Sequence, residues 1–282
     1  MRSPSKQKRL IVNADDYGFS DGVTAGILRA HREGVVTSTT VVANMPAAEE
    51  AMKRLADAPA LGVGVHLNVS QGPPLSKGGA ALAGPDGLMN RRALGTIAEC
   101  LCSRGVLDAF EAEFDAQIRW VLDHGLRPTH LDSHRHCHGY PPIFARVARL
   151  ARRYHVRFVR WHREVPGAGW PAAPFRQRRN AVMLNCFAAV NALLGADLRT
   201  TRGTWGIAHT GFIDAGWLIR AARLVRPGVT EIMVHPGLAR GLDAAATRLL
   251  ASREEELKAV CDPAIREAFA RHGIELTHYG RL

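Results

Sequence analysis

Short apolar runs typical of buried β-strands alternate along this chain with helix-like segments, and this order limits the possible folds more than any other feature. The expected strands cover residues 10–14, 38–43, 61–67, 129–132, 156–159, 230–235 and 274–277. The expected helices cover residues 20–32, 47–55, 108–124, 142–154, 175–194, 215–224, 249–261 and 263–272. Strands joined by helical crossovers are parallel. We therefore expect a single α/β domain over residues 1–282, a distorted or incomplete (β/α) TIM-like barrel.

The rival architecture is an open, doubly wound sheet that binds a dinucleotide. That fold carries a glycine-rich turn after its first strand, where backbone amides meet the phosphates. Here the first strand is followed by two carboxylates, Asp15 and Asp16. Carboxylates would repel phosphates at this position, so we set dinucleotide binding aside. The stretches 70–96 and 167–174 are rich in Gly and Pro, and loops of such length commonly cover or shape a site.

The overall charge and composition restrict the possible partners. The net charge is +11, but the sequence has no pattern typical of a nucleic-acid-binding module. No run reaches the roughly 18 apolar residues of a membrane span. The basic start also lacks the features of a secretory signal, which favours a cytoplasmic location. The five cysteines form no CxxC pair, and we interpret them as free thiols.

Ionisable side chains stand where three of the expected strands end. Asp15 and Asp16 close the first strand, His66 follows residues 61–65, and His134 follows Ser133. The carboxyl ends of barrel strands meet on one face, so these groups can converge on one ion. Two imidazoles and a carboxylate suit Zn²⁺, with Mg²⁺, Ni²⁺ or Co²⁺ as alternatives. Three protein ligands leave positions for water and substrate, which indicates catalysis.

The same face offers groups for proton transfer. We assign Asp16 to the metal and expect Asp15 to stay free as a general base. His235 closes a late strand and suits protonation of a leaving group. Asp132 is a candidate for orienting a metal-bound histidine. The alternative is that Asp15 and Asp16 only cap the helix that follows them and that each histidine has only a structural role.

Two further histidines leave the ligand set open. His136 and His138 crowd the segment that contains His134, and His138 stands four residues after it. The sequence does not exclude either of them from the metal.

The chain resembles the YdjC-like carbohydrate deacetylases, a metal-dependent family with a distorted barrel fold. The matching segments are residues 11–18, 34–40, 64–68, 128–138 and 231–237. The resemblance implies that Asp16, His66 and His134 hold the metal and that Asp15 is the base. It also implies that the substrate is an N-acetylated amino sugar. Asn68 ends the third segment and is a candidate for contact with the ligands or the substrate.

Residues 205–211 and the ending from Arg253 to Gly280 are most similar to the hopanoid-biosynthesis deacetylases of the HpnK type. This likeness implies an N-acetylglucosaminyl hopanoid, a sugar carried on a polycyclic lipid. The apolar stretch 181–194 and Trp161 and Trp170 could receive such a lipid at an anionic membrane surface. Alternatively, 181–194 is a core helix and both tryptophans are packing residues.

Other functions remain open at this point. The enzyme could act on soluble chitooligosaccharides, which would require an open sugar-binding cleft and no apolar surface. The chain could also be a metal- and sugar-binding protein without chemistry. Phosphoester hydrolysis is a weaker alternative, because such sites commonly use two metals and this ligand set supports one. An oligomer is also possible.

Overall fold

The structure is a computed structural model that describes residues 7–89, 103–165, 167, 170–244 and 247–282. Residues 90–96 of the first expected loop, residues 168–169 of the second, Cys100 and Cys102 lie outside these ranges. Cys186 and Cys261 carry free thiols. The strands are β1 (Lys8–Tyr17), β2 (Ser38–Val41), β3 (Gly62–Leu67), β4 (Leu131–Ser133), β5 (Thr204–Trp205), β6 (Gly228–Val234) and β7 (Ile274–Leu276).

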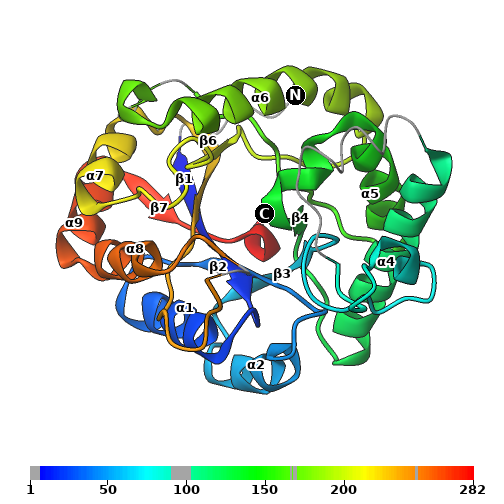
Figure 1. The fold of residues 1–282 in the computed structure, drawn as a ribbon. Helices are drawn as coiled ribbons and strands as arrows, with labels where there is room; N and C mark the ends of the chain where they lie inside the picture. The colour runs from blue at the N-terminus through cyan, green and yellow to red at the C-terminus, as the bar shows by residue number, and fades with distance from the viewer. Residues whose placement is uncertain (1–6, 90–102, 166, 168–169, 245–246) are drawn as a thin grey trace.

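The strands form one parallel, seven-stranded sheet in the order β4-β3-β2-β1-β6-β5, with β7 paired to the start of β1. In this register His66 on β3 lies beside Asp132 on β4. Figure 1 shows the sheet curled, with helices around it and the C-terminus inside the ring. The expected distorted α/β barrel is therefore confirmed.

Residues 156–159 do not form the regular strand that the sequence predicts. Leu131 N donates to Phe158 O at 3.0 Å and Arg160 N donates to Leu131 O at 2.9 Å on one side. On the other side Arg199 N donates to Arg157 O and Thr204 N donates to Trp161 O, at 2.8 and 3.0 Å. The segment alternates between partners and makes only isolated bridges. It still joins the β4 and β5 edges of the curled sheet.

Helices follow the strands as the alternation predicts. They are α1 (Asp21–Glu33), α2 (Ala48–Arg54), α4 (Arg104–Asp123), α5 (Pro141–Arg153), α6 (Phe175–Leu194), α7 (Ala215–Leu224), α8 (Ala251–Cys261) and α9 (Pro263–Arg271). Ser20 caps α1 by accepting a hydrogen bond from Val23 N at 3.2 Å. The two-residue strand β5 was not expected from the sequence.

Side chains of β1 alternate between two surroundings. Leu10, Val12 and Ala14 belong to the main apolar core under the helices, whereas Ile11 packs with Phe158 and Tyr279 inside the ring. Successive strand residues point to opposite faces, so Asp15 shares the inner side with Ile11. The inner face of the sheet therefore carries the ionisable groups, and the outer face carries the main core.

Helix α6 is buried on one side and exposed on the other. Ala181, Leu184 and Ala188 are buried, while Val182 is 52% and Leu193 is 81% exposed. One side of the stretch 181–194 therefore packs in the core, as expected of a core helix, and the other side is exposed. Within the described part of the chain, no helix combines the length and apolarity that crossing a membrane requires.

Candidate active site

Asp16, His66 and His134 lie together at the carboxyl ends of their strands. Each offers one ligand atom, and the three atoms lie within 4.8 Å of one another. Asp16 Oδ1 is 3.3 Å from His66 Nε2 and 3.0 Å from His134 Nδ1. Asp16 has a φ of 75°, a left-handed backbone that is uncommon for aspartate. The turn at the end of β1 therefore aims this carboxylate at both imidazoles.

The surroundings of these three residues fit a divalent cation. Burial alone would lower the pKa of His66, but Asp132 and Asp16 raise it to about 10, so the site favours positive charge. Asp16 Oδ2 accepts a hydrogen bond from Arg253 Nη2 at 2.5 Å, which leaves Oδ1 for a ligand. Burial lowers the pKa of His134, as a neutral imidazole ligand requires.

Asp132 orients His66 from the neighbouring strand. Its Oδ1 lies 2.7 Å from His66 Nδ1, and Thr40 Oγ1 donates to its Oδ2 at 3.1 Å. This bond directs His66 Nε2 toward Asp16 and fixes the plane of the ring. A second set of groups, Asp15, His66 and Asp132, is equally close together. In this second set, Asp15 and Asp132 already pair with Arg160. The first set, Asp16, His66 and His134, therefore suits a metal better.

Asp15, the expected base, is held in place by its neighbours. Its Oδ1 and Oδ2 each accept a hydrogen bond from Arg160 at 2.6 Å, and Asn13 Nδ2 donates to Oδ1 at 2.8 Å. Burial would raise the pKa of Asp15, but the Arg160 guanidinium holds it well below its usual range. Asp15 is therefore an ionised, clamped carboxylate beside the three candidate ligands.

Sequence reasoning missed Arg160. Its guanidinium is fully buried and contacts Asp15, Asp132 and Glu231, the last two at 2.9 and 2.8 Å. Glu231 in turn accepts hydrogen bonds from Tyr279 Oη and Thr204 Oγ1, at 2.8 and 2.5 Å. Arg160 directly follows the expected strand 156–159, and Asp15 and His66 drew attention because they also stand at strand ends. A charged residue at the end of an expected strand could have identified Arg160 as a candidate site residue.

His235 stands at the end of β6 and is 8% exposed. Burial lowers its pKa to about 4, although Asp15 and Asp16 oppose the shift. Its Nδ1 has no hydrogen-bond partner among the described residues. Its backbone N–H donates to Glu256 Oε2 at 2.6 Å, and Glu256 was also missed by sequence reasoning. His235 is thus a neutral, buried imidazole.

The two histidines that the sequence left open differ from His134 in their partners. His138 Nδ1 lies 2.5 Å from Ser133 Oγ, and Nε2 lies 3.2 Å from Arg160 O. His136 Nδ1 lies 3.3 Å from His162 Nε2. The structure does not bring either residue into the set of close ligand atoms.

Asn68 and Trp161 are held by contacts within the protein. Asn68 Nδ2 donates to Asn44 Oδ1 and Gln71 O, at 2.9 and 2.8 Å. The partly buried Trp161 packs against the apolar core, with its ring 6.2 Å from that of Phe144. Asn68 therefore organises the loop after β3, and Trp161 packs on α5.

Known proteins resemble this chain along nearly its whole length. Residues 9–271 match the family described as YdjC-like protein. A carbohydrate deacetylase from Geobacillus stearothermophilus is 34% identical over 269 residues, which cover 95% of this chain and 96% of that protein. A human carbohydrate deacetylase is 32% identical over 296 aligned residues, which cover 95% and 89% of the two chains.

A solved structure has the same fold. It is that of a protein from Enterococcus faecalis V583, provisionally named a cellobiose-phosphate cleavage protein. The TM-score is 0.75 at 26% sequence identity, and 98% of each chain is covered. Three findings point to the same family: the fold, the cluster of carboxylates and imidazoles, and the match over residues 9–271. The chain belongs to the YdjC-like protein family.

Proposed function

We propose that the protein is a metal-dependent N-deacetylase that hydrolyses the acetamide of an N-acetylglucosamine unit. The observation that carries this proposal is the position of Asp15, clamped by Arg160, directly beside the Asp16, His66 and His134 ligand set. The carbohydrate deacetylases with which it shares the family support the reaction class.

In this proposal Asp16, His66 and His134 hold one divalent ion, and the ligand types favour Zn²⁺. When bound, such an ion polarises a carbonyl oxygen and makes water more acidic. Asp132 keeps His66 in the tautomer and orientation that ligation needs. Arg253 occupies the second oxygen of Asp16, so this carboxylate offers one oxygen to the ion.

Asp15 accepts the proton of the attacking water. Because Arg160 keeps it ionised, its proton-accepting form is present throughout the neutral pH range. Arg160 also fixes the orientation of the carboxylate through two parallel hydrogen bonds. His235 protonates the departing amine. Because it is neutral at pH 7, His235 must first receive a proton, and the proton that Asp15 takes from the attacking water is the source.

For the substrate we propose an N-acetylglucosaminyl hopanoid, bound by a cytoplasmic protein at the inner face of the membrane. The exposed side of α6 supports a contact with lipid. Phe175, Val182 and Leu193 are 72%, 52% and 81% exposed, and Arg176 and Arg179 are exposed in its first turns. Basic and apolar side chains on one helix face suit an anionic membrane surface.

The test is acetate release by the zinc-loaded protein and by its Asp15→Asn variant. The variant should bind the same amount of zinc but release acetate about 10²-fold more slowly, because the base is lost. Exposed Asp243→Asn is the matched control and should behave as the unmodified protein. Equal rates for Asp15→Asn and the unmodified protein would refute the role of Asp15.

The choice of substrate is tested separately. Lipid-linked N-acetylglucosamine should release acetate faster than N,N′-diacetylchitobiose, because the apolar face of α6 has no role with the soluble sugar. A faster reaction with N,N′-diacetylchitobiose would favour chitooligosaccharides. Full zinc occupancy without acetate release from either compound would indicate a binding protein.

A further inference from the structure

A cavity lies on the side of the sheet away from Arg160. Its volume is about 330 Å³, and it is lined by residues from the 163–165 segment, β5, β6 and the turn after α7: Arg163, Val165, Arg202, Trp205, Leu224, Arg226 and Thr230. Thr204 and Glu231 point inward, toward Tyr279 and Arg160, so their neighbours Trp205 and Thr230 point outward. The cavity is therefore separated from the proposed active site by the sheet.

The cavity gathers positive charge. Arg163, Arg202 and Arg226 are exposed, and their guanidinium groups have no carboxylate partner in the described ranges. Elsewhere arginines pair with acids, as Arg152 does with Asp197 at 2.6 Å and Arg146 does with Glu111 at 2.8 Å. None of the described residues that line the cavity is acidic. Three unpaired guanidinium groups favour an anionic ligand.

Two glycines bring the arginine-bearing segments together. Gly203 has a φ of 151°, and a Cβ there would lie 1.9 Å from Arg163 O. Gly228 has a φ of 107°, and a Cβ there would lie 2.8 Å from Arg202 Cδ. Arg202 N also donates to Val229 O at 2.7 Å. A residue larger than glycine at position 203 or 228 would prevent these close contacts around Arg163 and Arg202.

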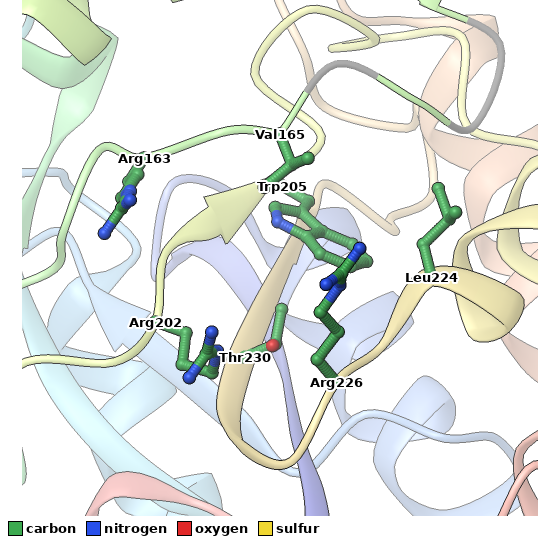
Figure 2. Close-up of a pocket in the computed structure, with 7 residues that line it drawn as sticks. All are labelled: Arg163, Val165, Arg202, Trp205, Leu224, Arg226 and Thr230. Carbon is green, nitrogen blue, oxygen red and sulfur yellow. The ribbon is translucent and has the colours of Figure 1, made fainter.

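The remaining walls are apolar apart from one hydroxyl. Trp205 is 7% exposed at the cavity floor, while Val165 and Leu224 are 54% and 40% exposed. Thr230 is 2% exposed, and it supplies the hydroxyl among the residues that line the cavity. In Figure 2, Arg202 and Arg226 lie on either side of Thr230, and Trp205 and Leu224 line other parts of the same cavity. An ester with a charged head and an apolar body fits these surroundings.

We propose that this cavity binds an organic phosphate, a phosphate ester whose anionic head meets Arg202 and Arg226 and whose apolar group lies against Trp205 and Leu224. Guanidinium groups bind phosphate oxygens in pairs, and the Thr230 hydroxyl supplies one more donor. The volume lies at the lower end of the roughly 300–1,000 Å³ that is usual for small-molecule sites. The ester can be a soluble compound or the head group of an anionic phospholipid.

The first experiment measures binding of phenyl phosphate to the full chain by isothermal titration calorimetry. The titration is repeated after chelator treatment, since phosphate also binds metal ions. Arg202→Ala with Arg226→Ala should weaken binding at least about 10-fold, because charge-assisted hydrogen bonds are lost. The control pair, exposed Arg32→Ala with Arg271→Ala, has the same change in charge and should bind as the unmodified protein. Equal weakening in both pairs would mean that only overall charge matters and would overturn the proposal.

A second pair of variants tests the site without removing an arginine. Leu224→Glu places a carboxylate at the cavity rim and should weaken binding of phenyl phosphate. Leu224→Gln introduces a side chain of the same size as Glu without its charge and should weaken binding much less. Unchanged acetate release in all of these variants shows that they fold. Inorganic phosphate should bind more weakly than phenyl phosphate. Equal binding of the two would contradict the role of the apolar wall.

Vesicles containing phosphatidylglycerol distinguish the two sources of the ester. Binding of phenyl phosphate that depends on Arg202 and Arg226 identifies a soluble ester as a ligand. Arginine-dependent binding to the vesicles without binding of phenyl phosphate identifies a lipid head group. Absence of both interactions overturns the proposal.

Discussion

Arg160 donates one hydrogen bond to each carboxylate oxygen of Asp15, and both donor–acceptor distances are 2.6 Å. The two residues are 145 positions apart in the chain. The same guanidinium also contacts Asp132, which orients His66. One cation therefore positions the proposed base and, through Asp132, a proposed metal ligand.

Arg160→Lys should reduce acetate release by about 10²-fold, because an ammonium group cannot reproduce the paired hydrogen bonds that orient Asp15. The pKa of Asp15 should rise as the guanidinium is lost. The acid limb of the pH–rate profile should therefore move to higher pH. Steady-state rates between pH 4 and 8 test this, with exposed Arg157→Lys as the control. An unchanged acid limb would contradict the link between Arg160 and Asp15.

Zinc binding should depend on His66 and His134 but not on His138. His66→Gln or His134→Gln should lower zinc affinity at least about 10-fold, because a metal-coordinating nitrogen is lost. His138→Gln should retain zinc, because both ring nitrogens of His138 face Ser133 and Arg160 in the protein. Competition with a coloured chelator measures these affinities. Loss of zinc from His138→Gln at native stability would add that residue to the ligand set.

Glu164 should make the folded protein less stable as the pH rises. Burial raises its pKa from 4.5 to about 7, although the Gly206 and Ala208 amides oppose the shift. Between pH 4.5 and 7 the folded state therefore binds more protons than the unfolded state, so the free energy of unfolding falls with increasing pH. The contribution is on the order of 3 kcal/mol over this window.

Glu164→Gln removes this titration. Urea unfolding measures the free energy of unfolding of both proteins. The value for the unmodified protein minus that for the variant should fall as the pH rises from 4.5 to 7. Exposed Glu267→Gln serves as the control and should show a constant difference over the same range. A constant difference for Glu164→Gln as well would mean that Glu164 titrates normally.

The apolar face of α6 should matter only for lipid-linked substrate. Val182→Ser with Leu193→Ser removes two side chains that are 52% and 81% exposed. Their loss should leave stability nearly unchanged and reduce the rate with lipid-linked N-acetylglucosamine several-fold, as expected for an interfacial helix. The rate with N,N′-diacetylchitobiose should stay the same. Parallel losses with both substrates would assign α6 a structural role instead.

Local patterns in the sequence were sufficient for most of the fold. Apolar runs and helix caps located β1, β3, β6 and the helices around them, because burial and backbone hydrogen bonding act within a few residues. The run 156–159 has the same pattern but makes only isolated bridges. Its partners, Leu131, Arg199 and Thr204, lie in segments whose positions depend on how the sheet curves.

The sequence by itself determined which residues could form the site. Asp16, His66 and His134 stand at strand ends, and parallel strands bring such ends to one face of a barrel whatever the details of packing. The tertiary structure alone decided how the charges pair. It clamps Asp15 with Arg160, engages both ring nitrogens of His138, and places Arg202 and Arg226 in one cavity with Trp205, where neither has a carboxylate partner among the described residues. Pairing depends on distances between segments far apart in the chain, and only the closed packing of the sheet and helices sets those distances.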